Sequence, residues 1–178
     1  MNTFVEAKTL EDNPHFFTQS RYALGQLNIE TIDEPIVDII KNIATIPYVF
    51  TLQSCYGHFL YNKLKAPQSI ETISIDAKDQ IIKYRIAYIA LCVENSINGR
   101  NLLEEICLLP LINPDNIQFG SAGWFWQRQI NSYVIQVESL KFQLQDQCRI
   151  HYEVALMLEK IRNKLFHELR KIIERHLR

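Results

Sequence analysis

The most constraining feature of the sequence is an uncharged stretch near its middle. Residues Tyr84–Val93 contain no charged side chain after Arg85, which predicts a strand buried on both faces at the centre of a sheet. The β-branched and aromatic run Tyr48–Leu52 predicts a second buried strand. Alternating side chains over Tyr133–Glu138 predict a third. A sheet of this kind needs helices to cover it.

Helices are predicted before, between and after these strands. Asn13-Pro14 and Asp33-Glu34-Pro35 each place a capping residue ahead of a proline near the first helical position. Asn95-Ser96 can cap a helix spanning about 97–109. The segment 146–177 has apolar residues at spacings of three and four, which predicts one long C-terminal helix. That helix would either pack across the sheet or pair with a second subunit as a homodimer.

Three shorter segments complete the predicted order. Ile70–Ile75 is interpreted as a short strand, and Ile117–Phe119 and Trp124–Trp126 as strands around a small-residue loop. A chain of 178 residues fits one domain. The order predicts a single α/β or α+β domain over 1–178, with its core at about 30–140. A mixed or mostly antiparallel sheet would be covered by helices, and the long C-terminal helix would be added to it.

Composition excludes several classes of protein. The net charge of −1 gives no general attraction to nucleic acid, and no stretch approaches the ~20 apolar residues of a membrane span. Residues 160–178 carry seven basic side chains against two acids, a tail that could touch phosphates or simply complement a helix dipole. The start lacks a basic region followed by an apolar run, so no secretory signal is expected. Four widely spaced cysteines indicate reduced thiols in a cytoplasmic protein.

The main candidate site is Ser54-Cys55-Tyr56-Gly57-His58, which follows the strand predicted at 48–52. Gly57 permits backbone angles that other residues resist. Cys55 could act as a nucleophile if His58 lowered its pKa, and His58 could act as a general base near neutral pH. The structural alternative is a small core cysteine and a histidine bonded to a neighbouring carbonyl.

A zinc site is the second possibility at these residues. Cys55-x-x-His58 and Cys148-x-x-His151 share one spacing and together would supply two thiolates and two imidazoles. Cys148 and His151 would lie on one face of the predicted C-terminal helix. Because the two pairs are far apart in the sequence, we expect no metal and keep this zinc site as an alternative.

Two more polar segments could face a ligand. Gly120 and Ser121 open a small-residue loop whose backbone N–H groups could contact an anion, or which could be a hairpin turn. Its spacing is not that of a dinucleotide fingerprint or a P-loop. Asn131 and Ser132 precede a predicted strand and could form a turn or bond a ligand.

The stretch from Asp33 to His58 resembles the tRNA wybutosine-synthesizing methyltransferase family. In that family an Asp-led helix precedes a Thr-Thr-Ser-Ser-Cys-Ser-Gly-Arg segment. The order of elements is similar over about 30–140, and the motif is specific at 51–58. The matching residues are Thr51, Ser54, Cys55 and Gly57. Gln53 stands where the family has a serine and His58 where it has an arginine, which removes a permanent charge.

The resemblance implies a function and a set of roles. It implies S-adenosylmethionine as the cofactor and methyl transfer to a nucleoside or RNA, without a Rossmann fingerprint. Cys55 and His58 are the expected catalytic residues. The expected cofactor- or substrate-binding residues are Thr51, Ser54, Gly57, Gly120, Ser121, Asn131 and Ser132. The alternative is a non-catalytic module on the same fold that binds a small molecule or a partner.

Overall fold

Two antiparallel sheets carry the strands of the computed structural model, which describes residues 6–60, 70, 81–138 and 147–177. The four-stranded sheet has the order β1-β4-β6-β5, with bounds Val49–Cys55, Ala87–Val93, Ser132–Val137 and Ile117–Ser121. The three-stranded sheet has the order β2-β3-β7, with bounds His58–Leu60, Ile81–Arg85 and Gln147–His151. The predicted fold class is confirmed in its α+β form.

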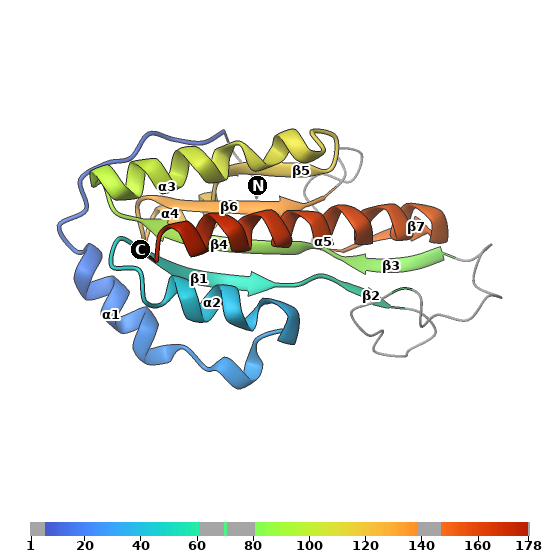
Figure 1. Ribbon diagram of the computed structural model, residues 1–178, viewed down its shortest axis with the longest axis horizontal. Helices are drawn as coiled ribbons and strands as arrows, with labels where there is room; N and C mark the ends of the chain where they lie inside the picture. The colour runs from blue at the N-terminus through green and yellow to red at the C-terminus, as the bar shows by residue number, and fades with distance from the viewer. Residues whose placement is uncertain (1–5, 61–69, 71–80, 139–146, 178) are drawn as a thin grey trace.

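The two sheets share two continuous lengths of chain. Figure 1 shows β1 passing into β2 and β3 passing into β4. The pairing continues across the junction, with Cys55 opposite Tyr88 in one sheet and His58 opposite Arg85 in the other. The buried central strand predicted over Tyr84–Val93 is confirmed for Ala87–Val93, which is the inner strand β4. Its first two residues belong instead to β3, because the strand is interrupted at Ile86. No glycine or proline lies at Ile86 to signal this interruption. The glycine of the bend is Gly57, on the neighbouring length of chain between β1 and β2.

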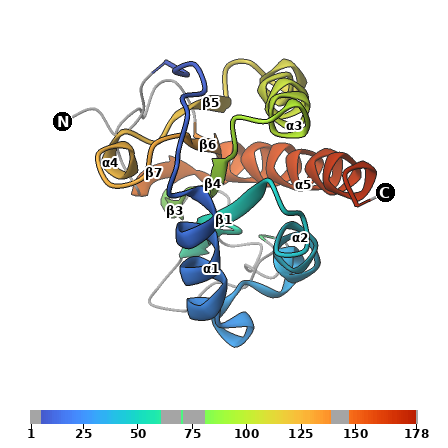
Figure 2. The same ribbon diagram turned by 90° about the vertical axis from the view of Figure 1, so that its left-hand side faces the viewer.

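Helices lie on both sides of the four-stranded sheet. Their bounds are α1 Phe16–Gln26, α2 Val37–Ile43, α3 Ile97–Cys107, α4 Gly123–Trp126 and α5 Tyr152–Arg175, with short 3-10 turns η1 Ile29–Thr31, η2 Glu34–Ile36 and η5 Leu109–Ile112. In Figure 2, α2, α3 and α5 lie on one side of the sheet, and α1 and α4 lie on the other. The strands are therefore covered on both faces, which explains why β6 is buried along its whole length.

The apolar stripe of α5 packs against other elements of the same chain. Its buried side chains include Leu158, Leu165, Leu169 and Ile172, all within the main hydrophobic cluster. This cluster also contains Ile39 and Ile43 of α2 and the inward-facing residues of β4. The helix thus packs across the sheet, as one of the two sequence interpretations expected.

Two predicted elements differ in type from those observed. Residues 124–126 were expected as a strand but belong to the short helix α4, where Trp126 packs edge-on against Tyr133 with ring centroids 5.7 Å apart. Residues 147–151 were expected in the C-terminal helix but form strand β7, with alternating exposed and buried side chains. The apolar spacing of three and four continues from Ile150 into α5, so the sequence pattern does not show the boundary between β7 and α5. The strand predicted at Ile70–Ile75 lies outside the described residues, apart from Ile70.

Candidate functional site

The turn between β1 and β2 is fixed by one glycine. Gly57 has φ +87, and a Cβ placed on it would come within 2.8 Å of the Ala87 Cβ. The bend of the first strand therefore packs directly on the start of β4, with no space for a side chain. The carbonyl oxygen of Gly57 accepts a hydrogen bond of 3.1 Å from Nη1 of Arg162. This turn is a rigid feature at the junction of the two sheets.

Three chemically reactive side chains meet at this turn, and we call Asp33, Cys55 and His58 the turn cluster. Their ligand atoms all lie within 4.8 Å of one another. His58 Nε2 is 3.2 Å from Asp33 Oδ1. The other carboxylate oxygen, Oδ2, accepts a 2.7 Å hydrogen bond from the N–H of Tyr56, and Cys55 Sγ accepts one of 3.4 Å from the N–H of Gly57. The two residues predicted as catalytic thus lie together.

Asp33 is the member that sequence reasoning did not select. It was interpreted only as the residue that starts a helix, yet its side chain makes no capping hydrogen bond to η2. Its carboxylate is used by the turn instead, over a separation of 23 residues from Tyr56. The available signal was the position of Asp33 at the head of the helix in the family resemblance.

The turn cluster contains an ion pair. The hydrogen bond that His58 donates to the Asp33 carboxylate raises the pKa of His58 to about 9, the contact with Cys55 adds to this, and burial opposes it. The hydrogen bond with His58 lowers the pKa of Asp33, against the raising effect of burial. In the protein as described, the imidazole therefore carries a proton at neutral pH and is a donor rather than a base.

A buried arginine supports the turn from α5. The Arg162 guanidinium is only 1% exposed and lies 4.1 Å above the ring of Tyr56. Its Nη2 is 3.5 Å from Oε1 of Glu159, which is also buried and accepts a hydrogen bond from the N–H of Ile70. Asn163 Oδ1 accepts from both Arg162 and the Tyr56 hydroxyl. The turn is thus bound to the long helix by charge-assisted contacts in a low-dielectric interior.

A cavity of about 660 Å³ lies between α1 and β1. The described residues that line it are Thr18, Gln19, Tyr22, Ala23, Gln26, Leu27, Asn28, Thr31, Ile32, Ile40, Thr51, Leu52, Gln53, Ser54 and Gln129. None of these side chains is ionisable at neutral pH, and hydroxyls and amides supply the polar groups. Two of the lining residues, Ile32 and Ser54, directly precede members of the turn cluster. The cavity and the cluster are therefore neighbours.

Two buried polar atoms face no protein partner at this cavity. Thr51 Oγ1 and Gln129 Nε2 are buried and make no hydrogen bond with any residue that the structure describes. Both residues line the cavity. Because a buried polar atom without a partner costs about 1–3 kcal/mol, these two atoms are unsatisfied groups in the wall of the cavity. Thr51 is also one of the four residues matched in the family resemblance.

The other predicted binding residues lie elsewhere and have other partners. Gly120 and Ser121 are in β5, and Asn131 and Ser132 lie at the start of β6, separated from β1 by β4. The Ser121 hydroxyl accepts a hydrogen bond from the N–H of Lys8. The Asn131 amide bonds both the N–H and the carbonyl of Glu11. These side chains hold the N-terminal segment, and they do not converge with the turn cluster.

The four-ligand zinc site is not formed. Cys148 and His151 lie in β7 rather than on a helix, and since they are three residues apart, they point to opposite faces of the strand. Cys148 is buried and His151 exposed. Among the described residues, the group that could hold a metal ion consists of the turn cluster and includes neither of them.

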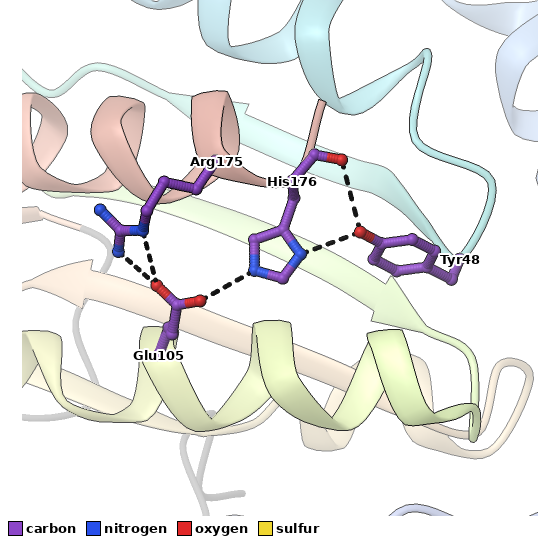
Figure 3. A network of polar contacts seen from close by, with 4 residues as sticks. All are labelled: Tyr48, Glu105, Arg175 and His176. Carbon is purple, nitrogen blue, oxygen red and sulfur yellow. Dashed lines mark hydrogen bonds and ion pairs between the residues drawn. The ribbon is translucent and has the colours of Figure 1, made fainter. Parts of the chain in front are cut away.

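A second polar cluster lies at the far end of α5, and we call Tyr48, Glu105, Arg175 and His176 the C-terminal network (Figure 3). His176 Nδ1 is 2.9 Å from the Tyr48 hydroxyl, and Nε2 is 3.0 Å from Oε1 of Glu105. Arg175 pairs with the other oxygen of Glu105. These contacts connect α3, the end of α5 and the residue before β1.

Comparisons with known proteins give remote structural matches only. No protein-family model and no curated protein matches the chain. Two structures of the PH1069 protein from Pyrococcus horikoshii are 13% and 14% identical to it, with TM-scores of 0.49 and 0.46. They cover 92% and 93% of this chain, and 96% and 93% of their own chains are covered. A hypothetical protein from Aeropyrum pernix is 15% identical over 80% of this chain and 98% of its own, with a TM-score of 0.44. Within the described residues, no helix combines the length and hydropathy of a membrane span.

Proposed function

We propose that the protein is a cytoplasmic enzyme that binds S-adenosylmethionine in the α1–β1 cavity and transfers its methyl group to a nucleoside or RNA. The observation that carries the proposal is the Thr51 hydroxyl. It belongs to the motif that resembles the wybutosine methyltransferase family, lines a cavity of about 660 Å³, and has no hydrogen-bond partner among the described residues. Cavities of roughly 300–1,000 Å³ are of the size that holds a cofactor.

The lining fits the nucleoside part of this cofactor. Adenine and ribose are uncharged and present donors and acceptors, which the amides of Asn28 and Gln129 and the hydroxyls of Thr51 and Ser54 can meet. The exposed ring of Tyr22 can stack on a base at the rim. When bound, S-adenosylmethionine supplies an electrophilic methyl group. The protein's own residues would orient the nucleoside and exclude water.

A second candidate is a nucleoside-binding module without catalysis. The observation that favours it is the uncharged lining, because the described residues of the cavity include no carboxylate, histidine, lysine or arginine to assist proton transfer. Such a module would bind the nucleoside part alone as well as the complete cofactor. The two candidates therefore differ in ligand preference and in turnover.

Calorimetry on the full chain separates these candidates. We expect S-adenosylmethionine to bind one-to-one and more tightly than adenosine, and labelled methyl groups to appear on added tRNA or nucleosides. Equal binding of adenosine and S-adenosylmethionine without transfer would favour the binding module. If neither ligand binds at millimolar concentration, the cavity is not a nucleoside site and both candidates fail.

The variant Thr51→Val tests the orphan hydroxyl directly. Removing a buried hydroxyl that lacks a partner should raise the free energy of unfolding by about 1 kcal/mol, whereas ligand affinity should fall about tenfold. Thr45→Val is the matched control, since its hydroxyl donates to the carbonyl of Asn42 far from this cavity. That control should lose a little stability and leave ligand affinity unchanged. If Thr51→Val loses stability or keeps full affinity, the hydroxyl does not serve a ligand.

A further inference from the structure

The turn cluster combines three different metal-binding donors from two segments of the chain. Asp33 offers a carboxylate oxygen, Cys55 a sulfur and His58 an imidazole nitrogen, all within 4.8 Å of one another. In a tetrahedral zinc site with bonds of roughly 2.0–2.3 Å, neighbouring donor atoms are about 3.3–3.6 Å apart. The 3.2 Å between Asp33 Oδ1 and His58 Nε2 is already close to that spacing, and a bound Zn²⁺ would displace the proton that Nε2 donates to Asp33. The sulfur needs to move by about 1 Å at most, which a small side-chain rotation supplies.

Neighbouring backbone groups orient these donors by hydrogen bonds, as the residues around a metal site orient its ligands. The N–H of Tyr56 binds Asp33 Oδ2, which leaves Oδ1 directed at His58. The N–H of Gly57 donates a hydrogen bond to the Cys55 sulfur, so this donor also has a supporting backbone contact. Both supporting donors are backbone groups of the β1–β2 turn, so the turn holds the carboxylate and the sulfur close to each other while the Cys55 side chain can still rotate.

Charge and access also suit a divalent cation. A carboxylate and a thiolate would balance two positive charges, and the nearby Arg162 is already paired with Glu159. The Asp33 and His58 side chains are 23% and 27% exposed, so an ion can enter from solvent while Cys55 stays buried. Mixed sulfur, nitrogen and oxygen donors favour Zn²⁺ over Mg²⁺ or Ca²⁺, which prefer oxygen alone.

We propose that Asp33, Cys55 and His58 bind one Zn²⁺ ion and leave its fourth coordination position open to solvent or a ligand. Three protein donors and one open position are typical of catalytic rather than structural zinc. The proposal uses none of the residues that line the α1–β1 cavity, so it can succeed or fail independently of methyl transfer.

Metal titration of the full chain tests the proposal. Protein freed of metal with a chelator is titrated with Zn²⁺ alone by calorimetry and with Co²⁺ alone by absorption spectroscopy. We expect one Zn²⁺ per chain, and Co²⁺ should give the near-ultraviolet charge-transfer band of a cobalt–thiolate bond. The wild-type result decides without any variant: absence of one-to-one Zn²⁺ binding, or absence of that band, overturns the proposal.

Variants then assign the donors. Cys55→Ser should abolish the charge-transfer band, and Asp33→Asn and His58→Asn should each weaken Zn²⁺ binding at least a hundredfold. The controls are Cys107→Ser and His151→Ala, which alter exposed residues outside the cluster and should bind as wild type does. Zn²⁺ should raise the melting temperature of wild type and controls only. If the three cluster variants keep full binding, or if a control abolishes it, the ion is held elsewhere and the assignment is wrong.

Discussion

Two histidine–carboxylate contacts are bound to different parts of α5, and their surroundings differ. At the turn cluster, His58 faces Asp33 beside a buried cysteine, and the supporting arginine of the helix is 1% exposed. At the C-terminal network, His176 faces Glu105, and the accompanying Arg175 side chain is 56% exposed (Figure 3). Both pairs are partly buried, with side-chain exposures of 27% and 23% for His58 and Asp33 and of 10% and 35% for His176 and Glu105. The regions differ in the supporting arginine, which is buried at the turn cluster and exposed at the C-terminal network.

This difference indicates that the contact between His176 and Glu105 serves the fold alone, whereas the contact between His58 and Asp33 can also serve a ligand. Both ring nitrogens of His176 are used, by the Tyr48 hydroxyl and by Glu105, and together they connect three elements. The turn cluster contains in addition a thiol, a partly exposed carboxylate and a neighbouring cavity. We therefore expect the C-terminal network to contribute modestly to stability. The stability of the β1–β2 turn should depend strongly on the buried Arg162, and we expect ligand binding at the turn cluster rather than at the C-terminal network.

The largest effect is expected for Arg162→Ala. The change leaves Glu159 buried without its counter-charge and removes the donor to the Gly57 carbonyl, so the free energy of unfolding should fall by about 3–5 kcal/mol. Urea denaturation measures it. The double change Arg162→Met with Glu159→Gln should recover part of the loss, because no uncompensated charge then remains. If Arg162→Ala costs no more than Arg175→Ala on the same helix, the contrast between buried and exposed regions is wrong.

Gly57→Ala should have the second largest effect. It forces a side chain into φ +87 and within 2.8 Å of the Ala87 Cβ, so we expect a loss of about 2–4 kcal/mol and a displaced turn. Gly25→Ala is the control, because a Cβ there meets no atom within 4 Å and the residue is helical. That variant should be neutral or slightly stabilising. Equal melting temperatures for the two variants would show that the turn is not rigid.

These two residues also show how far the sequence alone could go. Gly57 was predictable as a special backbone position, because a glycine two residues after Cys55, beyond the end of the predicted strand, permits backbone angles that other residues resist. Arg162 was not, since it occurs in a basic segment of a helix where most cations are solvated. Only the packing of α5 against the turn reveals that this one is buried under Tyr56.

The site was also predicted only in part, because its local contacts could be read from the motif and its long-range contacts could not. Cys55 and His58 are neighbours in sequence, so their proximity followed from the motif, and the resemblance also selected Thr51 and Ser54, which line the cavity. Asp33 is joined to the turn by a contact across 23 residues. Ser121 and Asn131 looked equally polar, but their partners are backbone groups of residues 8 and 11. Sequence patterns predict local chemistry and do not show which distant segment uses it.

His176→Ala should have a smaller effect than either change at the turn. It removes one hydrogen bond each from Tyr48 and Glu105 and an edge-on ring contact, for an expected loss of about 1–2 kcal/mol. Thermal unfolding measures the loss. Binding of S-adenosylmethionine and of Zn²⁺ should both be unchanged, whereas His58→Asn should weaken the binding of Zn²⁺. If His176→Ala changes either ligand's affinity, the two histidines are coupled through α5 and do not have separate roles.

Arg175→Ala should have the smallest effect on the free energy of unfolding, and the dependence of this effect on salt should show whether it comes from the surface ion pair with Glu105. The guanidinium pairs with Glu105 at the surface, where solvent and salt screen the interaction. We expect a loss below about 0.5 kcal/mol at low ionic strength, and no difference from wild type in 1 M salt. His176→Ala, by contrast, should keep most of its loss in high salt, because its hydrogen bond to the Tyr48 hydroxyl does not depend on a surface charge pair. Denaturation of both variants at two salt concentrations separates these contributions. A salt-independent loss above 1 kcal/mol for Arg175→Ala would mean that the C-terminal network is held as firmly as the turn.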